Sequence, residues 1–385
     1  MLLPSRPLFF VFFVGGWILA GSQVTMAQSA LPPDAPRALQ QFDTDLTNTT
    51  VDLSELRSGG PSKDGIPSID QPSFVSIEAA RSWIDADEPV IVLEHNGTAR
   101  AYPLQILTYH EIVNDRIGET PVAVTFCPLC YSAIAFKRTI DGEPVTFGVS
   151  GLLRNSDLVM YDRKTETLWQ QFTGDAIAGT LAGATLEVIP TQLVSFQQFA
   201  SNYPESQVLS RETGYRRPYG QNPYAGYDDI DSSPFAYDGP TDDRLPPKEK
   251  VVAVSLGETH KAYPHSVTKE KRVIHDAIDG RSLVVFHAPG AVSALDARRI
   301  ASSKEDGTTG VFDPQVDGRT LRFQYDGKGR FTDVQTGSVW TVAGRAVEGP
   351  LNGSKLDRVS HGDYFAFSWF AFRPDAVLYS ADEDS

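Results

Sequence analysis

The stretch V122-A-V-T-F-C-P-L-C-Y-S-A-I-A-F136 holds both cysteines of the chain, and its pattern occurs twice. A shift by 161 positions lays it without a gap on L283-V-V-F-H-A-P-G-A-V-S-A-L295. Cys127 and Cys130 then fall on Ala288 and Ala291. We therefore expect features that both halves share to belong to the fold. Features that only one half has are candidates for function.

The repeat extends well beyond this stretch and predicts the fold class. D-x-x-T-x-T-x-W at 162–169 returns as D-x-x-T-x-S-x-W at 333–340, within runs of alternating apolar residues bounded by turn residues. We predict a mainly β (α+β) protein built of two tandemly duplicated β-rich lobes in a pseudo-two-fold arrangement. The expected parts are a signal peptide (1–27), an extended N-terminal arm (28–75) anchored by residues such as Leu53 and Leu56, a first lobe (76–210), a connector rich in Tyr, Pro and Asp (211–250) and a second lobe (251–380).

The N-terminus and the charge predict the compartment and exclude some partners. Arg6 precedes an apolar run from Leu8 to Ala20 that is short for a membrane span, and small residues up to Ala27 follow, as is typical of a signal peptide. We expect an exported protein, periplasmic or extracellular, without stable membrane insertion of the mature chain. The net charge of −15 argues against a nucleic-acid partner, and the sequence indicates no other partner.

The C-P-L-C spacing favours chemistry over a purely structural disulfide. A disulfide that closes so short a loop contributes on the order of 2 kcal/mol, and a chain of 385 residues has a core that does not need it. The second half carries alanines in the matching frame. Redox chemistry or metal binding is therefore the preferred interpretation.

Other features of the first half are also missing from the second. His110-Glu111 stands where the second half has Lys271-Arg272, and Gln170-Gln171 stands where it has Thr341-Val342. A longer first-half loop contains G151-L-L-R-N-S-D157. If a hairpin turns at 115–119, His110 lies opposite a residue between Thr125 and Cys127, close enough for an imidazole and a thiol to share a ligand.

Several motifs together identify a resemblance. A-Y-P-L, H-E-I-V-N-D, T-F-C-P-L-C, S-G-L-L-R-N-S-D-L-V-M-Y-D-R, L-W-Q-Q and Y-G-x-N-P-Y resemble the exported prokaryotic family DUF3179 over about 76–379. The family name records no assigned activity, so the resemblance implies a family and no mechanism. It supports treating one set of residues as a constellation: His110, Glu111, Asn114, Asp115, Cys127, Cys130, Arg154, Asn155, Ser156 and Asp157. Tyr224 of the connector is expected to cover it.

The leading hypothesis is a thiol site that binds a soft or transition-metal ion, copper or zinc, or undergoes thiol–disulfide redox chemistry. Cys127, Cys130 and His110 are the predicted metal ligands and catalytic residues. One alternative is a non-catalytic binding module in which Cys127 and Cys130 form a rigidifying disulfide and no cofactor binds. Another is a hydrolase that uses Cys127 with His110.

Overall fold

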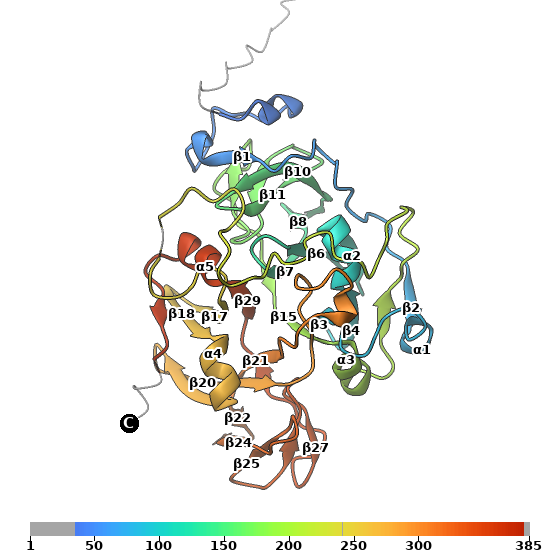
Figure 1. The fold of residues 1–385 in the computed structure, drawn as a ribbon, viewed down its shortest axis with the longest axis vertical. Helices are drawn as coiled ribbons and strands as arrows, with labels where there is room; N and C mark the ends of the chain where they lie inside the picture. The colour runs from blue at the N-terminus through green and yellow to red at the C-terminus, as the bar shows by residue number, and fades with distance from the viewer. Residues whose placement is uncertain (1–34, 241, 381–385) are drawn as a thin grey trace, which may run out of the picture. The chain divides into compact units, whose positions relative to one another are not determined.

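Strands outnumber helices along the described chain, which comprises residues 35–240 and 242–380 of a computed structural model (Figure 1). The mainly β class is therefore confirmed. The predicted signal peptide, residues 1–27, and the first residues of the predicted arm lie outside the described residues.

The described part of the first half forms three sheets and a small hairpin. The sheet ordered β15-β3-β4-β16-β2 contains β2 (Phe74–Ser76), β3 (Pro89–His95), β4 (Thr98–Pro103), β15 (Thr191–Ser195) and β16 (Gln207–Leu209). The sheet ordered β14-β7-β6-β5 contains β5 (Ile112–Ile117), β6 (Thr120–Cys127), β7 (Ser132–Lys137) and β14 (Val188–Ile189). The sheet ordered β1-β10-β11-β12-β13 contains β1 (Leu56–Ser58), β10 (Phe147–Arg154), β11 (Asp157–Asp162), β12 (Leu168–Gln170) and β13 (Ala176–Ala178). The hairpin pairs β8 (Thr139–Ile140) with β9 (Glu143–Pro144).

The second half has corresponding sheets. The sheet ordered β29-β17-β18-β30 contains β17 (Lys250–Leu256), β18 (Thr259–Pro264), β29 (His361–Phe365) and β30 (Val377–Leu378). The sheet ordered β19-β20-β21-β28 contains β19 (Val273–Ile278), β20 (Arg281–Ala288), β21 (Thr308–Asp313) and β28 (Asp357–Arg358). The sheet ordered β24-β25-β26-β27 contains β24 (Phe323–Tyr325), β25 (Phe331–Asp333), β26 (Val339–Trp340) and β27 (Ala346–Glu348). A hairpin pairs β22 (Gln315–Val316) with β23 (Arg319–Thr320).

The helices are short, and their starts follow from the sequence. The α-helices are α1 (Ile77–Ala80), α2 (Leu104–His110), α3 (Phe196–Asn202), α4 (His265–Lys271) and α5 (Ala366–Phe372), with 3₁₀ helices η1 (Arg37–Gln41), η2 (Leu53–Glu55) and η3 (Ile300–Ser302). Ser76 caps α1 by accepting a hydrogen bond from the amide of Ala79, and Ser195 caps α3 in a capping box with Gln198. Pro103 and Pro264 hold the N-cap positions of α2 and α4.

The same succession of elements occurs in both halves. Two antiparallel strands, a helix and a hairpin appear as β3-β4-α2-β5-β6 and again as β17-β18-α4-β19-β20. Each half closes with a strand, a helix and a strand, β15-α3-β16 and β29-α5-β30. A tandem duplication predicts this succession, and we retain duplication as a proposal for its origin.

The gap-free match of the two halves, however, ends at the cysteines. Cys127 and Ala288 are the last residues of β6 and β20, as the match requires. Residues 128–131 then turn directly into β7, whereas residues 289–307 separate β20 from β21. Ser132 therefore corresponds to Thr308 and not to Ser293. The pairing of Cys130 with Ala291 was wrong, because Ala291 lies inside this long segment.

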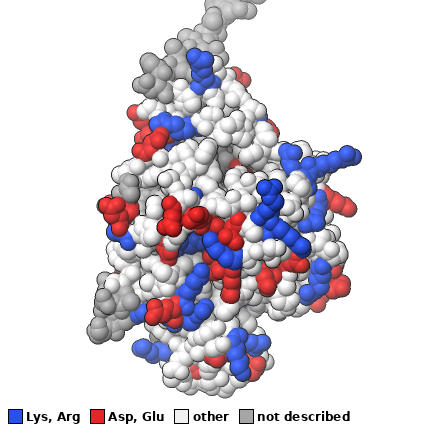
Figure 2. All heavy atoms as spheres, viewed as in Figure 1, with Lys and Arg blue, Asp and Glu red and all other residues white. Residues whose placement is uncertain are grey.

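One hydrophobic cluster spans the two halves. The cluster around Phe126 and Cys127 also contains Ala253, Phe365 and Trp369 from the second half. Residues of both halves consequently pack against the hairpin that carries the cysteines. On the face drawn in Figure 2, acidic and basic side chains are interspersed.

The arm lies against the first half, and the connector contacts both halves. Leu53 and Leu56 of the arm are buried as predicted, and β1 adds to the edge of β10. In the described residues of the connector, 211–240 and 242–249, the backbone forms turns and bends with no helix or strand. The connector is nevertheless anchored, since the Tyr227 hydroxyl donates to the carbonyl of Leu129 in the cysteine turn at 3.2 Å.

Candidate functional site

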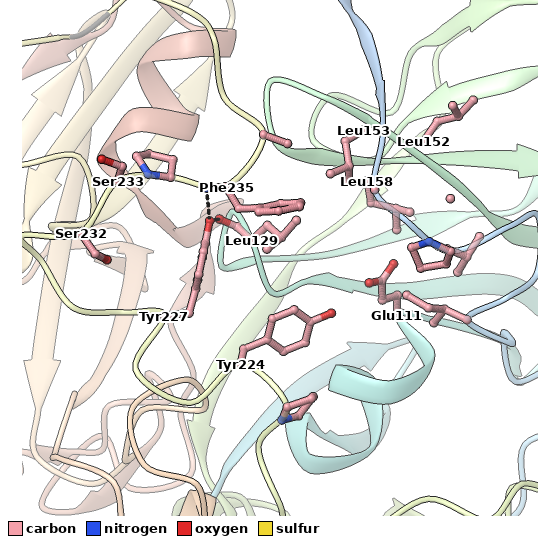
Figure 3. A pocket seen from close by; sticks show the side chains of 18 of the residues that line it. Glu111, Leu129, Leu152, Leu153, Leu158, Tyr224, Tyr227, Ser232, Ser233 and Phe235 are labelled. Atoms are coloured by element: carbon pink, nitrogen blue, oxygen red, sulfur yellow. Dashed lines mark hydrogen bonds between the residues drawn. The ribbon is translucent and has the colours of Figure 1, made fainter. Parts of the chain in front are cut away.

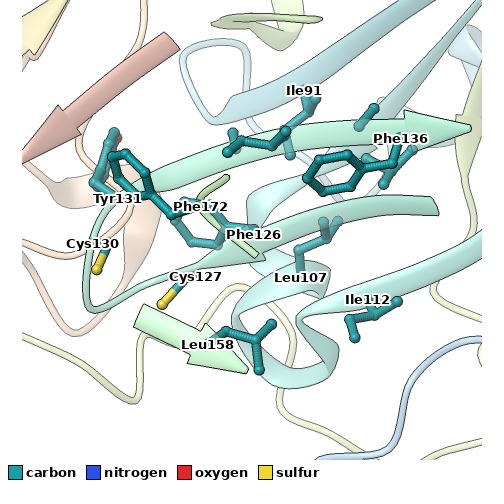
Figure 4. Close-up of a cluster of buried hydrophobic side chains, with 14 of the residues drawn as sticks. Ile91, Leu107, Ile112, Phe126, Cys127, Cys130, Tyr131, Phe136, Leu158 and Phe172 are labelled. Carbon is teal, nitrogen blue, oxygen red and sulfur yellow. The ribbon is translucent and has the colours of Figure 1, made fainter. Parts of the chain in front are cut away.

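The hairpin of β6 and β7 brings the two cysteines together. Cys127 pairs in register with Ser132, so the intervening turn returns Cys130 towards Cys127. Tyr131 completes the turn in the left-handed region, with a φ of 56°. Both cysteines are free thiols, and their side chains point to the same side of the hairpin, towards Leu158 of β11 (Figure 4). Only 1% of Cys127 and 0% of Cys130 is exposed.

Asp157 completes a group of three potential metal ligands. The Sγ atoms of Cys127 and Cys130 and a carboxylate oxygen of Asp157 all lie within 4.8 Å of one another. Asp157 begins β11, directly after a tight turn in which Asn155 and Ser156 both have positive φ. The Asn155 carbonyl accepts a weak hydrogen bond of 3.9 Å from the Cys130 thiol. The Ser156 carbonyl accepts one of 3.9 Å from the Cys127 thiol. The predicted loop therefore does converge on the cysteine turn.

Neighbouring polar groups fix the Asp157 carboxyl. Gln170 Nε2 donates to Oδ2 at 2.6 Å and the amide of Phe172 donates to the same oxygen at 3.0 Å. Ser132 Oγ lies 3.3 Å from Oδ1 and donates to Gln171 at 2.7 Å. Supporting contacts of this kind orient metal ligands in proteins. In the sequence, the absence of Gln170 and Gln171 from the second half had indicated that these two residues belong to the site. The contacts of Ser132 with Asp157 and Gln171 were not predicted.

The structure does not place His110 beside the cysteines. His110 is the last residue of α2, and strand β5 begins only at Ile112, so the predicted hairpin does not include it. Its Nδ1 donates to the carbonyl of Pro67 at 2.7 Å, and its Nε2 lies 2.6 Å from the Tyr219 hydroxyl. Both ring nitrogens are thus engaged, and the assignment of His110 as a ligand was wrong. Burial lowers the pKa of the ring, which favours this neutral form.

Glu111 is the member of the His110-Glu111 pair that faces the site. It caps α2 with a φ of 57°, which redirects the chain between the helix and β5. Desolvation, together with the nearby Asp157 carboxyl, raises the pKa of Glu111 to about 8. Glu111 is therefore mainly protonated at neutral pH.

Burial also raises the pKa of the three potential ligands. Desolvation raises the pKa of Asp157 to about 7, although its hydrogen bonds act in the opposite direction. Desolvation likewise raises the pKa of Cys127, and raises that of Cys130 well above its ordinary value. Metal-free thiols in this environment are weak nucleophiles, because the thiolate is the reactive form.

Arg154 points away from the thiols. Its Nε donates to Glu55 Oε2 at 2.7 Å, and its guanidinium lies 5.7 Å from the ring centre of Phe372. These contacts tie the arm and α5 to the β10–β11 hairpin. Arg154 therefore has a structural role in this arrangement.

Asn114 and Asp115 are also engaged elsewhere. Asn114 donates to the Phe147 carbonyl at 2.8 Å and accepts from the Phe147 amide at 2.9 Å, which joins β5 to β10. Asp115 accepts hydrogen bonds from Arg100 and from the Tyr102 hydroxyl. Neither residue belongs to the ligand group.

A cavity of about 790 Å³ lies beside the thiol site (Figure 3). Leu129 of the cysteine turn, Leu158 of β11 and Glu111 line it from the first half. Tyr224 and Tyr227 of the connector line it from the other side. Tyr224 thus faces the cavity beside the thiol site, and its expected role as a cover of the cysteines stays a prediction.

Comparison with known proteins identifies the family. The family model described as "Protein of unknown function (DUF3179)" matches residues 63–376. The chain belongs to the DUF3179 family. No curated protein and no solved structure matches this DUF3179 chain. Among its described residues, no helix has the length and apolar character needed to cross a membrane.

Proposed function

We propose that this DUF3179 protein is an exported metal-binding protein whose Cys127, Cys130 and Asp157 hold a divalent transition-metal ion such as zinc. The supporting observation is the approach of the three ligand atoms to within 4.8 Å. Ligands at zinc distances in a tetrahedron lie roughly 3.3–3.8 Å apart, so a small contraction of the group would suffice.

The donor types favour zinc over copper(I). Two thiolates suit either ion, but copper(I) prefers soft ligands throughout, and Asp157 offers a hard carboxylate oxygen. Zinc accepts sulfur, nitrogen and oxygen donors together. Two thiolates and a carboxylate carry three negative charges, which suit a divalent cation better than a monovalent one in a buried site.

Three protein ligands leave one tetrahedral position open. Structural zinc sites are usually closed by four protein ligands, and catalytic sites keep a position for water or substrate. No fourth His, Cys, Asp or Glu joins the group within the part of the chain that the structure describes. The donor count therefore favours an open site.

Thiol–disulfide exchange is the second candidate, supported by the two adjacent free thiols. Oxidation of Cys127 and Cys130 would form one S–S bond and pass two electrons and two protons to a partner disulfide, which becomes a dithiol. The burial and raised pKa of both thiols disfavour this reaction in the arrangement seen here. Metal binding is therefore the preferred function.

Metal analysis of protein purified from the exported fraction, combined with thiol titration, tests the proposal. We expect one metal ion per chain in the wild type, none in Cys127→Ala and a strongly reduced content in Asp157→Asn. His110→Gln is the matched control and should keep the ion. Metal-free protein with a complete Cys127–Cys130 disulfide would instead favour redox chemistry. Equal metal loss in His110→Gln and Cys127→Ala would overturn the ligand set.

Export is the second part of the proposal and is tested separately. The apolar run from Leu8 to Ala20 and the small residues that follow support it. N-terminal sequencing of the mature protein should give a chain that begins at Gln28. A mature protein that retains the apolar run would contradict the predicted cleavage. The exclusion of nucleic acid and of stable membrane insertion remains a prediction from charge and hydropathy.

A further inference from the structure

The cavity beside the thiol site is lined by segments distant in the chain. Residues 59–66 of the arm, residues 223–236 of the connector and the β10–β11 hairpin all contribute to its lining (Figure 3). Much of the wall is apolar and includes Leu129, Leu152, Leu153, Leu158 and Phe235. Its volume of about 790 Å³ falls within the range of small-molecule sites.

Two large polar side chains of this wall point into the cavity without a protein partner. The Glu111 carboxyl and the Tyr224 hydroxyl both point into the cavity in Figure 3, and neither side chain forms a hydrogen bond with any described residue. The hydroxyl of Tyr227 and the ammonium group of Lys248, which also line the cavity, are occupied. The Tyr227 hydroxyl donates to the Leu129 carbonyl, and Lys248 Nζ donates to the Tyr227 carbonyl at 2.6 Å and to Ser232 Oγ at 2.7 Å.

The backbone does not require a glutamate at position 111. Its left-handed conformation at the end of a helix is one that glycine and asparagine adopt most easily. The corresponding cap of α4 is Arg272, with a φ of 63°. A carboxyl group without a partner at the edge of an apolar cavity carries a desolvation cost. A ligand that hydrogen-bonds to it would offset this cost.

We propose that the cavity binds an uncharged, mainly apolar organic molecule that carries a carbonyl group, held between the Tyr224 hydroxyl and the Glu111 carboxyl. The apolar wall disfavours a charged ligand. The Tyr224 hydroxyl can donate to the carbonyl oxygen, and a protonated Glu111 can donate to the same oxygen. This inference goes beyond the proposed metal site and does not depend on it.

Binding of the uncharged naphthalene ketone prodan tests the inference. Its fluorescence emission moves to longer wavelength when its carbonyl oxygen accepts a hydrogen bond. We expect saturable binding to the full-length mature protein. Tyr224→Phe and Glu111→Leu should each weaken binding by roughly 3- to 10-fold, the usual effect of one lost hydrogen bond, and should shift the emission to shorter wavelength.

Three further variants make the test specific. Ala225 is exposed and lines the cavity, so Ala225→Trp should block binding without disturbing the core. Tyr215→Phe removes a hydroxyl from an exposed tyrosine outside the lining and should bind prodan as the wild type does. The Cys127→Ala/Cys130→Ala variant should also bind normally, which separates this inference from the metal site. Absence of saturable binding to the wild type, or unchanged affinity and emission in both Tyr224→Phe and Glu111→Leu, would overturn it.

Discussion

The backbone amide of Phe365 donates a hydrogen bond of 3.0 Å to the carbonyl of Cys130. Phe365 belongs to the second half and Cys130 to the first, so the half without cysteines helps to hold the cysteine turn. The hydroxyl of Ser368 reaches the same carbonyl at 3.3 Å. The second half therefore supports the candidate metal site without supplying a ligand.

A buried ion pair of the second half also contacts the turn. Lys250 pairs with Asp306, and its Nζ lies 3.5 Å from the ring centre of Tyr131. The Tyr131 hydroxyl lies 3.4 Å from the Asp306 carboxylate. Although burial acts to raise it, Lys250 holds the pKa of Asp306 well below its usual range. Lys250→Met would leave this buried carboxylate with only the longer ionic contact of 3.7 Å to Lys269, and we expect it to lower the free energy of unfolding by up to about 3 kcal/mol.

Denaturant titration measures this loss. The double variant Lys250→Met/Asp306→Asn removes both charges and should recover a large part of it. Equal stability of the single and double variants would show that loss of the Lys250 partner to the Asp306 charge is not the cause.

The cysteines should contribute little to the stability of the metal-free fold. Replacement of both buried thiols by alanine removes two small groups, and we expect a loss of about 1–3 kcal/mol in the presence of a chelator. Without chelator, the wild type should gain additional stability from bound metal, whereas the double variant should gain none. Thermal unfolding of both proteins with and without chelator measures the two effects. A chelator effect of the same size in both proteins would contradict metal binding at these residues.

Glu88 should make stability depend on pH. Desolvation raises its pKa to about 7, and the charge of the Asp85 carboxylate adds to this effect. The hydrogen bonds from the Asp85 amide and Gln105, and the charge of Arg211, act in the opposite direction. The folded state therefore retains a proton between about pH 4.5 and pH 7 that the unfolded chain has lost. The contribution of Glu88 to stability falls as pH rises through this window, by on the order of 3 kcal/mol in total.

Glu88→Gln should remove this decline. Urea unfolding at pH 5 and at pH 8 measures the free energy of unfolding of both proteins. Between these pH values, the variant should become more stable relative to the wild type. Glu78→Gln, on the exposed side of α1, is the matched control and should leave the pH profile unchanged. A difference that does not vary with pH would contradict a raised pKa for Glu88.

Gly151 should be essential for the packing of the arm. It has a φ of 77°, and a Cβ at this position would lie 2.2 Å from the carbonyl oxygen of Pro61. Gly151→Ala combines a strained backbone with a backbone clash, and we expect a loss of more than about 2 kcal/mol together with faster proteolysis within residues 59–66. Gly142→Ala has a similar φ of 81° and no neighbour within 4 Å, so it controls for backbone strain alone. Equal effects of the two substitutions would exclude the close approach of Pro61 as the cause.

The sequence by itself determined the local structure and the nature of the candidate site. Alternating apolar residues encoded the hairpin of β6 and β7, and serine or proline at the N-caps placed α1, α2 and α3. The spacing of Cys127 and Cys130 on one hairpin was sufficient to bring the thiols together. These features depend on hydrogen bonds and sterics between residues close in the chain.

The tertiary structure alone decided which residue joins the cysteines as the third candidate ligand, and what surrounds the site. α2 continues through His110, and the left-handed backbone at Glu111 then turns the chain, so Glu111 faces the site while His110 bonds to Pro67 and Tyr219. Asp157 approaches the sulfur atoms because the β10–β11 hairpin packs against the cysteine hairpin. The cavity likewise forms only where the arm and the connector meet the first half. Such contacts depend on how distant segments share one core, which local spacing does not encode.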